Sequence, residues 1–490
     1  MMVHGEGGTG KSRLLKAISD TFAKYGASHL LAKTAMSGVA ASIVNGSTLH
    51  GWAALPVKKG TGTWVERSST GIGDRRKKNI GQAQWLMIDE MSMLTTPLLA
   101  HLSHITGVVR ASVNSVEASI PFGGLNVILM GDFHQLPPVA SQGKELFHSS
   151  PVGDLPCKGK SLYNQFDVVI RLEEQMRIYD PTWVGILQRT CTSDCTSTML
   201  DDITEIRKLV LTNPDSEIPD FTKAPWNDTI LVMSRNSVHV GWNSSALKSH
   251  CQSTGHTRYV LVADDRINGQ PVSRVQKLAV AHLKPDDTNK LPNMVEFALD
   301  MRAMVLLNMA TDADLANGSR GIIKDIILDP RETGTPDDTN TIFLSNPPSA
   351  ILFAPLNGER ITFPGLSDGI VPVFPSRTSF PLHGKTVHRQ QYALTPAYAF
   401  TDFKSQGQTI ESVIVDLARP PSSFLSGFNA YVALSRSRGR DTIRLLRDFN
   451  DSLFTVHPNE QLRAEDERLD LLARQTIERY HCGEFRYFGM

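Results

Sequence analysis

Gly5-Glu6-Gly7-Gly8-Thr9-Gly10-Lys11-Ser12 matches the phosphate-binding loop pattern G-x-x-x-x-G-K-[ST] at every fixed position. The preceding residues, 2–4, read as the end of a strand, and Lys11–Lys24 carry apolar residues at helical spacing. The loop therefore lies between a strand and a helix, where backbone N–H groups and the helix dipole favour a bound phosphate. The competing interpretation is a chance glycine-rich turn, and the agreement of pattern and context argues against it.

This loop predicts a nucleotide-binding site formed by one set of neighbouring residues. We expect Lys11 to bridge the β- and γ-phosphates of ATP, and the Ser12 hydroxyl to bind Mg²⁺. The residues expected to bind the nucleotide are Gly5, Gly7, Gly8, Thr9, Gly10, Lys11 and Ser12.

The composition describes a globular protein of several domains. The chain has 490 residues, of which 41% are hydrophobic and 20% charged, which excludes a disordered polypeptide. The formal net charge is zero, so a nucleic-acid partner would need a local basic groove. The five cysteines include one close pair, Cys191 and Cys195, with no second pair or nearby histidine to complete a zinc site. No stretch is long and apolar enough to predict a membrane-spanning helix.

Two further apolar runs end in polar residues and extend the predicted site. The run 85–88 ends in Asp89 and Glu90, and the run 125–130 leads to Gln135. Ligands bind at the carboxyl ends of parallel strands, so we expect Asp89 to hold Mg²⁺ and Glu90 to activate the attacking water. Gln135 is placed to sense the γ-phosphate. His134 has no partner histidine or cysteine nearby in the sequence, which favours packing or a DNA contact over a metal site.

Together these elements resemble the Pif1-like DNA helicases of superfamily 1B, and the resemblance extends from Gly5 to about Phe449. The sequences of these motifs are most similar to those of Pif1-like helicases of fungi and their Helitron-type transposons. One departure is Phe403, where many relatives have histidine; a phenylalanine could still stack on a base. The resembling segments, in chain order, are 34–41 with 48–51, 86–93, 121–124 with 131–139, 172–177, 315–321, 401–409 and 431–437.

The resemblance implies an α/β fold with two RecA-like P-loop domains in tandem. A small 1B wedge is expected as an insertion in the first domain, and a β-rich, SH3-like 2B module in the second. The basic run of the 1B wedge, at residues 75–78, is interpreted as a solvated loop tip. The expected boundaries are 1–175 for domain 1A with the wedge at about 53–80, 176–299 and 391–455 for the two parts of domain 2A, 300–390 for 2B, and 456–490 for a C-terminal helix and tail.

The resemblance also assigns residues outside the loop. Arg177 and Arg436 occupy the positions of arginine fingers, and either could instead be an ordinary ion-pairing residue. Together with Lys11, Glu90 and Gln135 they form the expected catalytic set. The residues expected to line the path of a DNA strand are Ser37, Gly38, Thr48, His50, Pro137, Lys404, Ser405 and Gln406.

The function implied is that of an ATP-dependent 5′–3′ DNA helicase in repair, recombination, telomere maintenance or transposition. The expected cofactors are ATP and Mg²⁺, and the expected partners are single-stranded and forked DNA, with no membrane. A monomer inside the cell is expected, in the nucleus or the mitochondrion. An RNA helicase of the same superfamily is an alternative, although the Leu-Pro-Pro after Gln135 favours the Pif1 side.

A second alternative is a non-catalytic remnant. Only four residues precede Gly5, and no adenine-contacting glutamine motif lies upstream, so we expect a truncated first strand. Such a chain could bind ATP weakly or act only as a binding module. Against this, every expected catalytic residue is present in the sequence.

Overall fold

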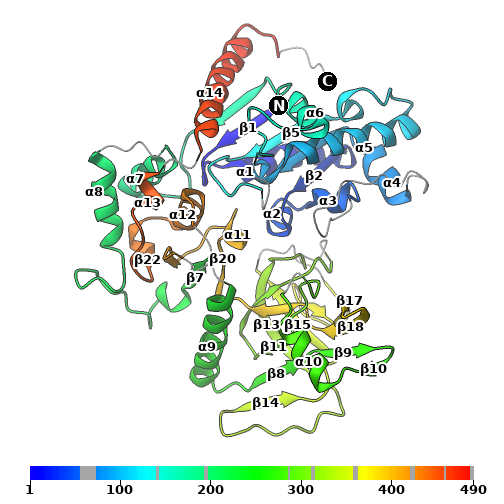
Figure 1. Cartoon of the computed structure of the whole chain (residues 1–490), viewed down its shortest axis with the longest axis vertical. Helices are drawn as coiled ribbons and strands as arrows, with labels where there is room; N and C mark the ends of the chain where they lie inside the picture. Colours follow the sequence, from blue (N-terminus) through cyan, green and yellow to red (C-terminus); the bar gives the residue numbers. More distant parts are fainter. Residues whose placement is uncertain are drawn as a thin grey trace. The chain divides into compact units, whose positions relative to one another are not determined.

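The structure, a computed structural model, consists of two compact units (Figure 1). Unit 1 contains Met1–Ser234 and Ser405–Met490, and unit 2 contains Arg235–Lys404. The residues that the structure describes are 1–55, 73–138, 143–192, 197–234, 236–284, 287–310, 315–356, 362–419, 425–456 and 459–485.

A six-stranded parallel sheet forms the first half of unit 1, in the order β3-β2-β4-β5-β1-β6. Its central strands are apolar along nearly their whole length, which suits a sheet covered by helices on both faces. The strands are β1 (Met2–Gly5), β2 (Leu31–Ala35), β3 (Ser47–Thr48), β4 (Trp85–Asp89), β5 (Asn126–Gly131) and β6 (Val169–Leu172).

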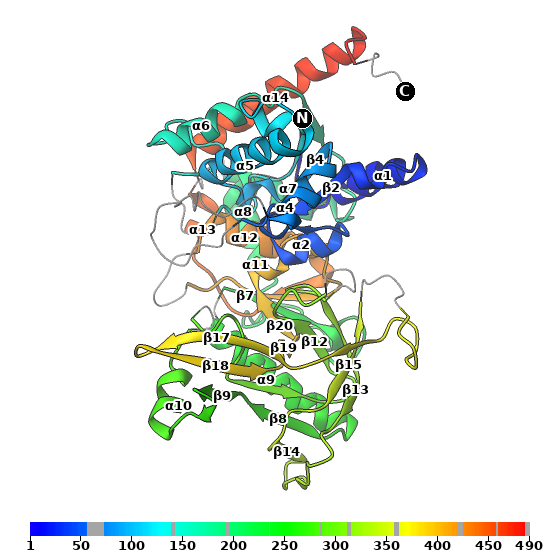
Figure 2. The same ribbon diagram turned by 90° about the vertical axis from the view of Figure 1, so that its right-hand side faces the viewer.

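Helices cover both faces of this sheet. In Figure 2, α1 (Lys11–Lys24) lies on one side of β2 and β4, and α5 (Thr96–Asn114) and α6 (Asp154–Tyr163) lie on the other. Leu15 of α1 and its partly buried apolar neighbours pack against β1, β2, β4 and β5, which confirms the predicted amphipathic helix. The shorter helices are α2 (Gly38–Ile43), α3 (Leu49–Trp52) and α4 (Asp74–Gln82).

A smaller parallel sheet forms the second half of unit 1. β21 (Val413–Asp416) lies between β7 (Ile230–Met233) and β22 (Ile443–Leu445), and all three strands are fully buried. This arrangement follows the same rule as the first sheet, with apolar strands and helical cover. The helices of this half are α7 (Pro181–Thr192), α8 (Ser197–Arg207), α12 (Gly427–Leu434) and α13 (Ser452–Thr455).

The last helix of unit 1, α14 (Glu460–His481), packs on the edge of the first sheet along β6. Leu462 and Leu469 are buried on its inner face, at the spacing of an amphipathic helix. Polar contacts fix its position, because Thr476 accepts a hydrogen bond from the Val169 N–H at 3.0 Å and Glu465 accepts one from the Tyr163 hydroxyl. The predicted helix at the end of the chain is therefore confirmed, with packing on the chain's own body.

Unit 2 is rich in antiparallel strands. A five-stranded sheet has the order β16-β15-β13-β12-β19, a four-stranded sheet has the order β10-β9-β18-β17, and β8 lies between β11 and β14. Two helices, α9 (Asn236–Thr254) and α10 (Arg274–Ala281), belong to this unit, and α11 (Asp402–Ser405) ends at its boundary. The strands are β8 (Arg258–Val262), β9 (Asp264–Ile267), β10 (Gln270–Pro271), β11 (Met294–Phe297), β12 (Arg302–Val305), β13 (Arg320–Ile327), β14 (Thr341–Leu344), β15 (Ala350–Pro355), β16 (Val371–Val373), β17 (Ser376–Leu382), β18 (Lys385–Gln391), β19 (Leu394–Pro396) and β20 (Ala399–Thr401).

Residues 300–390 were predicted to form a β-rich module, and the strands β12 to β17 lie within this range. The β-rich unit also includes β8 to β11, which lie before residue 300. The predicted domain boundaries stay predictions. Most of the predicted wedge falls on residues 56–72, outside the described residues. The basic run 75–78 is not the loop tip that was predicted, because it belongs to the helix α4.

Candidate nucleotide-binding site

The loop between β1 and α1 has the shape expected for a phosphate-binding loop. Gly8 and Gly10 have φ angles of 101° and 92°, a region that favours glycine. A side chain at Gly8 would also overlap Gln175 and Arg177, which lie directly against the loop. The Lys11 ammonium lies inside the loop and donates to the Gly5 and Glu6 carbonyl oxygens at 2.6 and 2.8 Å.

A pocket of about 510 Å³ opens at this loop, entirely within unit 1. The pocket brings together the predicted residues of the loop, of the two strand ends and of the second half of the unit. Burial lowers the pKa of Lys11, while Asp132, Glu90 and Asp89 oppose that change. The lining residues are Gly7, Gly8, Gly10, Lys11, Ser12, Arg13, Ala40, Ile43, Asp89, Glu90, Gln135, Met176, Arg177, Tyr179, Gly407, Thr409, Arg436 and Arg438.

Two buried carboxylates lie at the end of β4. Asp89 accepts a hydrogen bond from the Glu90 N–H at 2.9 Å, and Glu90 has a left-handed backbone with φ of 58°. Non-glycine residues adopt this conformation at a cost, and such strain often marks functional positions. Burial and the neighbouring Glu90 charge raise the pKa of Asp89 to about 7. Burial also raises the pKa of Glu90, against a hydrogen bond that the Gln406 amide donates to its carboxylate at 2.8 Å.

The carboxylates suit a divalent cation. Asp89 and Ser12 both line the pocket, and two adjacent buried carboxyl groups leave negative charge that a bound cation would neutralise. Mg²⁺ prefers oxygen ligands and usually takes only one or two from the protein, with phosphates and water supplying the rest. Within the described ranges, no group of three or more His, Cys, Asp or Glu residues is placed to hold a metal ion.

Asp132, at the end of β5, connects several parts of the site. Its carboxylate accepts hydrogen bonds from the His134 N–H at 3.0 Å, the Gln135 amide at 3.3 Å and the Tyr431 hydroxyl at 3.0 Å. Tyr431 in turn accepts from the Gly7 N–H at 3.0 Å. Gln135 therefore lies beside the loop, held by Asp132.

The His134 ring bonds Asp466 of α14 at 3.0 Å, so packing is the role that the structure assigns to this side chain. The predicted alternative, a contact between His134 and DNA, would require an exposed side chain, and His134 is buried.

The structure brings both predicted arginine fingers to the pocket. A Cβ atom at Gly7 would lie 3.4 Å from the Arg436 guanidinium, and one at Gly8 would lie 2.8 Å from the Arg177 Cβ atom. Arg177 donates to the Ser435 carbonyl oxygen at 3.1 Å. Burial lowers the pKa of Arg436 to about 9, and the Arg177 charge adds to this effect.

The residues predicted to line a DNA strand occupy different environments. Ser37 and Thr48 cap α2 and α3, where their hydroxyls accept from the Ala40 and Gly51 N–H groups at 3.1 Å. Gly38 and His50 follow on the same helices, Pro137 is partly buried, and burial lowers the pKa of His50.

The second group of predicted strand contacts lies around α11. In unit 2, burial and Lys290 lower the pKa of Lys404 to about 8. In unit 1, Ser405 and Gln406 are buried, and Gln406 faces Glu90 rather than solvent. Neither of these two side chains is open to a strand in this conformation, and the assignment of all these residues to DNA stays a prediction.

Sequence reasoning missed two functional contacts. Tyr431 and Asp132 lie in the resembling segments 431–437 and 131–139 without an assigned role, and their hydrogen bond joins residues 299 positions apart. Gln406 was expected at DNA and bonds Glu90 instead. A hydroxyl within a run of apolar residues, as in Tyr431 between Ala430 and Val432 of α12, was the available signal for the first contact.

Comparison with known proteins agrees with this geometry. The human "ATP-dependent DNA helicase PIF1" is 27% identical over 462 residues, covering 93% of this chain and 59% of that protein. The "ATP-dependent DNA helicase RRM3" of Saccharomyces cerevisiae is 26% identical over 524 residues, covering 96% and 65%. Residues 1–189, which carry the loop and both strand ends, match the model of the PIF1-like helicase family. The chain is therefore similar to Pif1-like helicases over most of its length.

The fold is also that of solved Pif1 helicases. The Pif1 helicase of Candida albicans aligns with a TM-score of 0.68 at 23% identity, covering 96% of this chain and 95% of that chain. A Bacteroides Pif1 helicase "in complex with ADP-AlF3 and ssDNA" aligns with a TM-score of 0.63 at 18% identity, covering 96% and 93%. The predicted α/β fold with tandem RecA-like domains is thus confirmed. The chain spans less than two thirds of the length of the curated Pif1 relatives named above.

Proposed function

We propose that the chain is an ATP-driven DNA helicase that couples ATP hydrolysis to movement along single-stranded DNA. One observation carries this proposal: a single pocket holds Lys11, the Asp89–Glu90 pair and two arginines from the second half of unit 1. This is the arrangement that phosphoryl transfer requires, with cations around the phosphates and a carboxylate for the attacking water. The names of the relatives, ATP-dependent DNA helicases, support it.

Each residue has a distinct role in this proposal. Lys11 and the loop N–H groups hold the β- and γ-phosphates, and Gln135 orients the water together with Glu90. Burial raises the pKa of Glu90, which makes it a better proton acceptor for that water. Mg²⁺, held by Ser12, Asp89 and the phosphates, would supply positive charge at the triphosphate. Arg177 and Arg436 stabilise the charge of the transition state, a contribution worth roughly 10³–10⁵ in rate.

Movement requires that the contacts between the protein and DNA change with the state of the bound nucleotide. The Gln406–Glu90 hydrogen bond supports such a coupling, because Gln406 belongs to the segment that the family resemblance assigns to the strand path. Loss of the γ-phosphate would alter the charge beside Glu90 and hence this hydrogen bond. The segment 404–406 would then shift its contacts with the DNA backbone, which carry no sequence preference.

Partners and direction follow from the relatives. Single-stranded and forked DNA are the proposed substrates, in agreement with the titles of the Pif1 structures. Movement from 5′ to 3′, a monomeric state and a nuclear or mitochondrial location are proposals from the family resemblance. No helix in the described part of the chain has the length and apolarity that crossing a membrane demands.

Strand displacement tests the proposal. A duplex with a 5′ single-stranded tail should be unwound in the presence of ATP and Mg²⁺, and one with a 3′ tail should remain paired. The Glu90→Gln variant should bind ATP and DNA without unwinding. Displacement from the 3′-tailed duplex would contradict the direction, and displacement by the Glu90→Gln variant at the parent rate would contradict the site.

The same assay separates the alternatives. An RNA helicase would displace a strand from an RNA track faster than from DNA. A non-catalytic remnant would bind DNA without hydrolysing ATP on any track. The presence of all the predicted catalytic side chains in one pocket favours an active enzyme over the remnant.

A further inference from the structure

The guanidinium of Arg436 is already occupied by protein acceptors. Its Nε donates to the Val432 carbonyl oxygen at 2.7 Å, and its Nη2 donates to the Ser435 hydroxyl at 2.7 Å. Its Nη1 donates to the Ser405 and Gln408 carbonyl oxygens at 3.3 and 3.0 Å. The residue is 0% exposed, so a new acceptor would have to displace one of these contacts.

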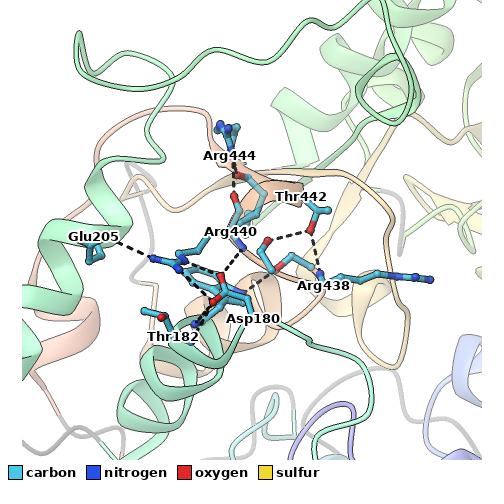
Figure 3. A network of polar contacts seen from close by, with 11 residues as sticks. Asp180, Thr182, Glu205, Arg438, Arg440, Thr442 and Arg444 are labelled. Atoms are coloured by element: carbon cyan, nitrogen blue, oxygen red, sulfur yellow. Dashed lines mark hydrogen bonds and ion pairs between the residues drawn. The ribbon is translucent and has the colours of Figure 1, made fainter.

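Arg438, two residues further on, has the opposite character. Its side chain is exposed and lines the same pocket. Among the described residues, none is recorded as a hydrogen-bond or ion-pair partner of its guanidinium. Figure 3 shows this side chain extending away from the surrounding network of polar contacts. All of its donors are therefore available to a ligand in the pocket.

The backbone of Arg438 is nevertheless held firmly. Its N–H donates to the Thr442 hydroxyl at 3.2 Å, and its carbonyl oxygen accepts from the Tyr179 N–H at 3.1 Å. The next residue, Gly439, is packed so closely that a Cβ atom there would lie 3.1 Å from the Asp180 Cβ atom. The start of the side chain is thus fixed relative to the segment 175–179 that lies along the loop.

An ion pair braces this arrangement (Figure 3). The Arg440 guanidinium donates to Asp180 at 2.7 and 3.3 Å, and its backbone N–H also donates to Asp180 at 3.3 Å. The same carboxylate caps the start of α7, where it accepts from the Thr182 and Trp183 N–H groups at 3.1 and 3.2 Å. Arg444 adds a contact, donating to the Arg440 carbonyl oxygen at 3.0 Å.

We propose that Arg438 binds the phosphate groups of the nucleoside triphosphate in this pocket, and that the Asp180–Arg440 ion pair positions it. The inference rests on the proposed function, because it concerns the same pocket. A guanidinium presents paired N–H donors that match two phosphate oxygens, which an ammonium cannot do. Arg438 is suited to this contact because its guanidinium has no hydrogen-bond or ion-pair partner among the described residues, while its backbone is fixed.

Nucleotide affinity of single variants tests the inference. We expect Arg438→Ala to weaken binding of a fluorescent ATP analogue by about 10- to 100-fold, the usual range for a lost charged hydrogen bond. Arg438→Lys should recover part of the loss, because the charge remains without the paired donors. Arg463→Ala, which removes an exposed arginine from α14, is the matched control and should bind as the parent does. Equal thermal melting of the variants shows that they fold.

A double-mutant cycle tests the positioning role. Arg440→Ala should weaken nucleotide binding by several fold when Arg438 is present. It should have no additional effect in the Arg438→Ala background, since the residue that it positions is then missing. Equal losses in both backgrounds would show that Arg440 acts without Arg438 and would overturn this part of the inference.

The outcomes also separate this inference from the proposed function. If the parent binds the analogue, Lys11→Ala abolishes binding and Arg438→Ala has no effect, the inference is wrong and the nucleotide site stands. If Arg13→Ala weakens nucleotide binding and Arg438→Ala does not, the phosphate contact belongs to Arg13, which also lines the pocket and is exposed, and the inference is wrong. Failure of the folded parent to bind any nucleotide would overturn both proposals.

Discussion

The Tyr431 hydroxyl donates a hydrogen bond to the Asp132 carboxylate at 3.0 Å and joins the two halves of unit 1 beside the phosphate-binding loop. The same oxygen accepts from the Gly7 N–H at 3.0 Å, so one side chain connects the end of β5, the helix α12 and the loop. Burial and nearby acids raise the pKa of Tyr431, which keeps the proton available for donation. The position of Gln135, also bound to Asp132, depends on this connection.

Replacing Tyr431 by Phe removes both hydrogen bonds with little change in volume. We expect kcat/KM for ATP to fall about tenfold, since a buried hydrogen bond to a charged group contributes about 1.5–3 kcal/mol. The midpoint of thermal unfolding should fall by only a few degrees. Steady-state ATPase kinetics measure the effect, and unchanged kinetics in a folded variant would mean that Asp132 and the loop are held in other ways.

The Gln406–Glu90 hydrogen bond predicts a sensitive position outside the phosphate-binding loop. Gln406→Ala should lower kcat about tenfold with a smaller effect on ATP affinity, because Glu90 loses the donor that orients it. Gln406→Glu should be more harmful, since a second carboxylate would repel Glu90 in a buried site. ATPase rates of the two variants provide the comparison, and equal activity of Gln406→Glu and the parent would exclude the coupling role.

The His134–Asp466 pair predicts a pH-dependent contribution to stability. Burial lowers the pKa of His134, but the hydrogen bond and charge of Asp466 outweigh it and raise the pKa above its usual value. A raised pKa in the folded state stabilises the protein at low pH, and this contribution is lost as the pH rises through the folded pKa. The parent should therefore exceed Asp466→Asn in unfolding free energy by about 1 kcal/mol near pH 6.

Urea unfolding at several pH values checks this prediction. The difference between the parent and Asp466→Asn should shrink towards pH 9, where His134 is neutral in both states. A difference that grows with pH would contradict the assignment of the proton to His134.

The packing of α14 predicts unequal effects of two leucines on the same helix. Leu469 is 1% exposed and Leu471 is 50% exposed. Leu469→Ala should lower the unfolding free energy by about 2–5 kcal/mol, because it leaves a cavity against the body of unit 1. Leu471→Ala is the matched control and should change it by less than about 1 kcal/mol. Equal effects of the two substitutions would mean that α14 does not pack on the body in solution.

Local pattern was sufficient to predict the elements that carry phosphate chemistry. The glycine-rich loop, the helix after it and the acidic end of β4 depend on residues close together in the sequence, and the structure brings them into one pocket. Contacts between distant residues were harder to predict. The Tyr431–Asp132 and Gln406–Glu90 pairs depend on how the two halves of unit 1 pack, and no local spacing encodes that packing.

The same difference between local and distant contacts explains which arginines could be assigned from the sequence. The family resemblance predicted Arg436 as a finger and assigned no role to Arg438. Its distinct position becomes visible only through the Asp180–Arg440 pair, whose partners lie 260 positions apart. In unit 2, a β-rich module was predicted from residue 300, but two of the three sheets combine strands from both sides of that residue.

ATP hydrolysis by the chain, measured with and without single-stranded DNA, tests the central proposal most directly. We expect the parent to hydrolyse ATP and to do so faster when single-stranded DNA is added. Lys11→Ala should abolish hydrolysis in both conditions while retaining DNA binding, because the lysine holds the phosphates and is not among the residues predicted to line the strand. Hydrolysis by Lys11→Ala at the parent rate, or a folded parent without DNA-stimulated hydrolysis, would contradict a DNA motor driven from this pocket.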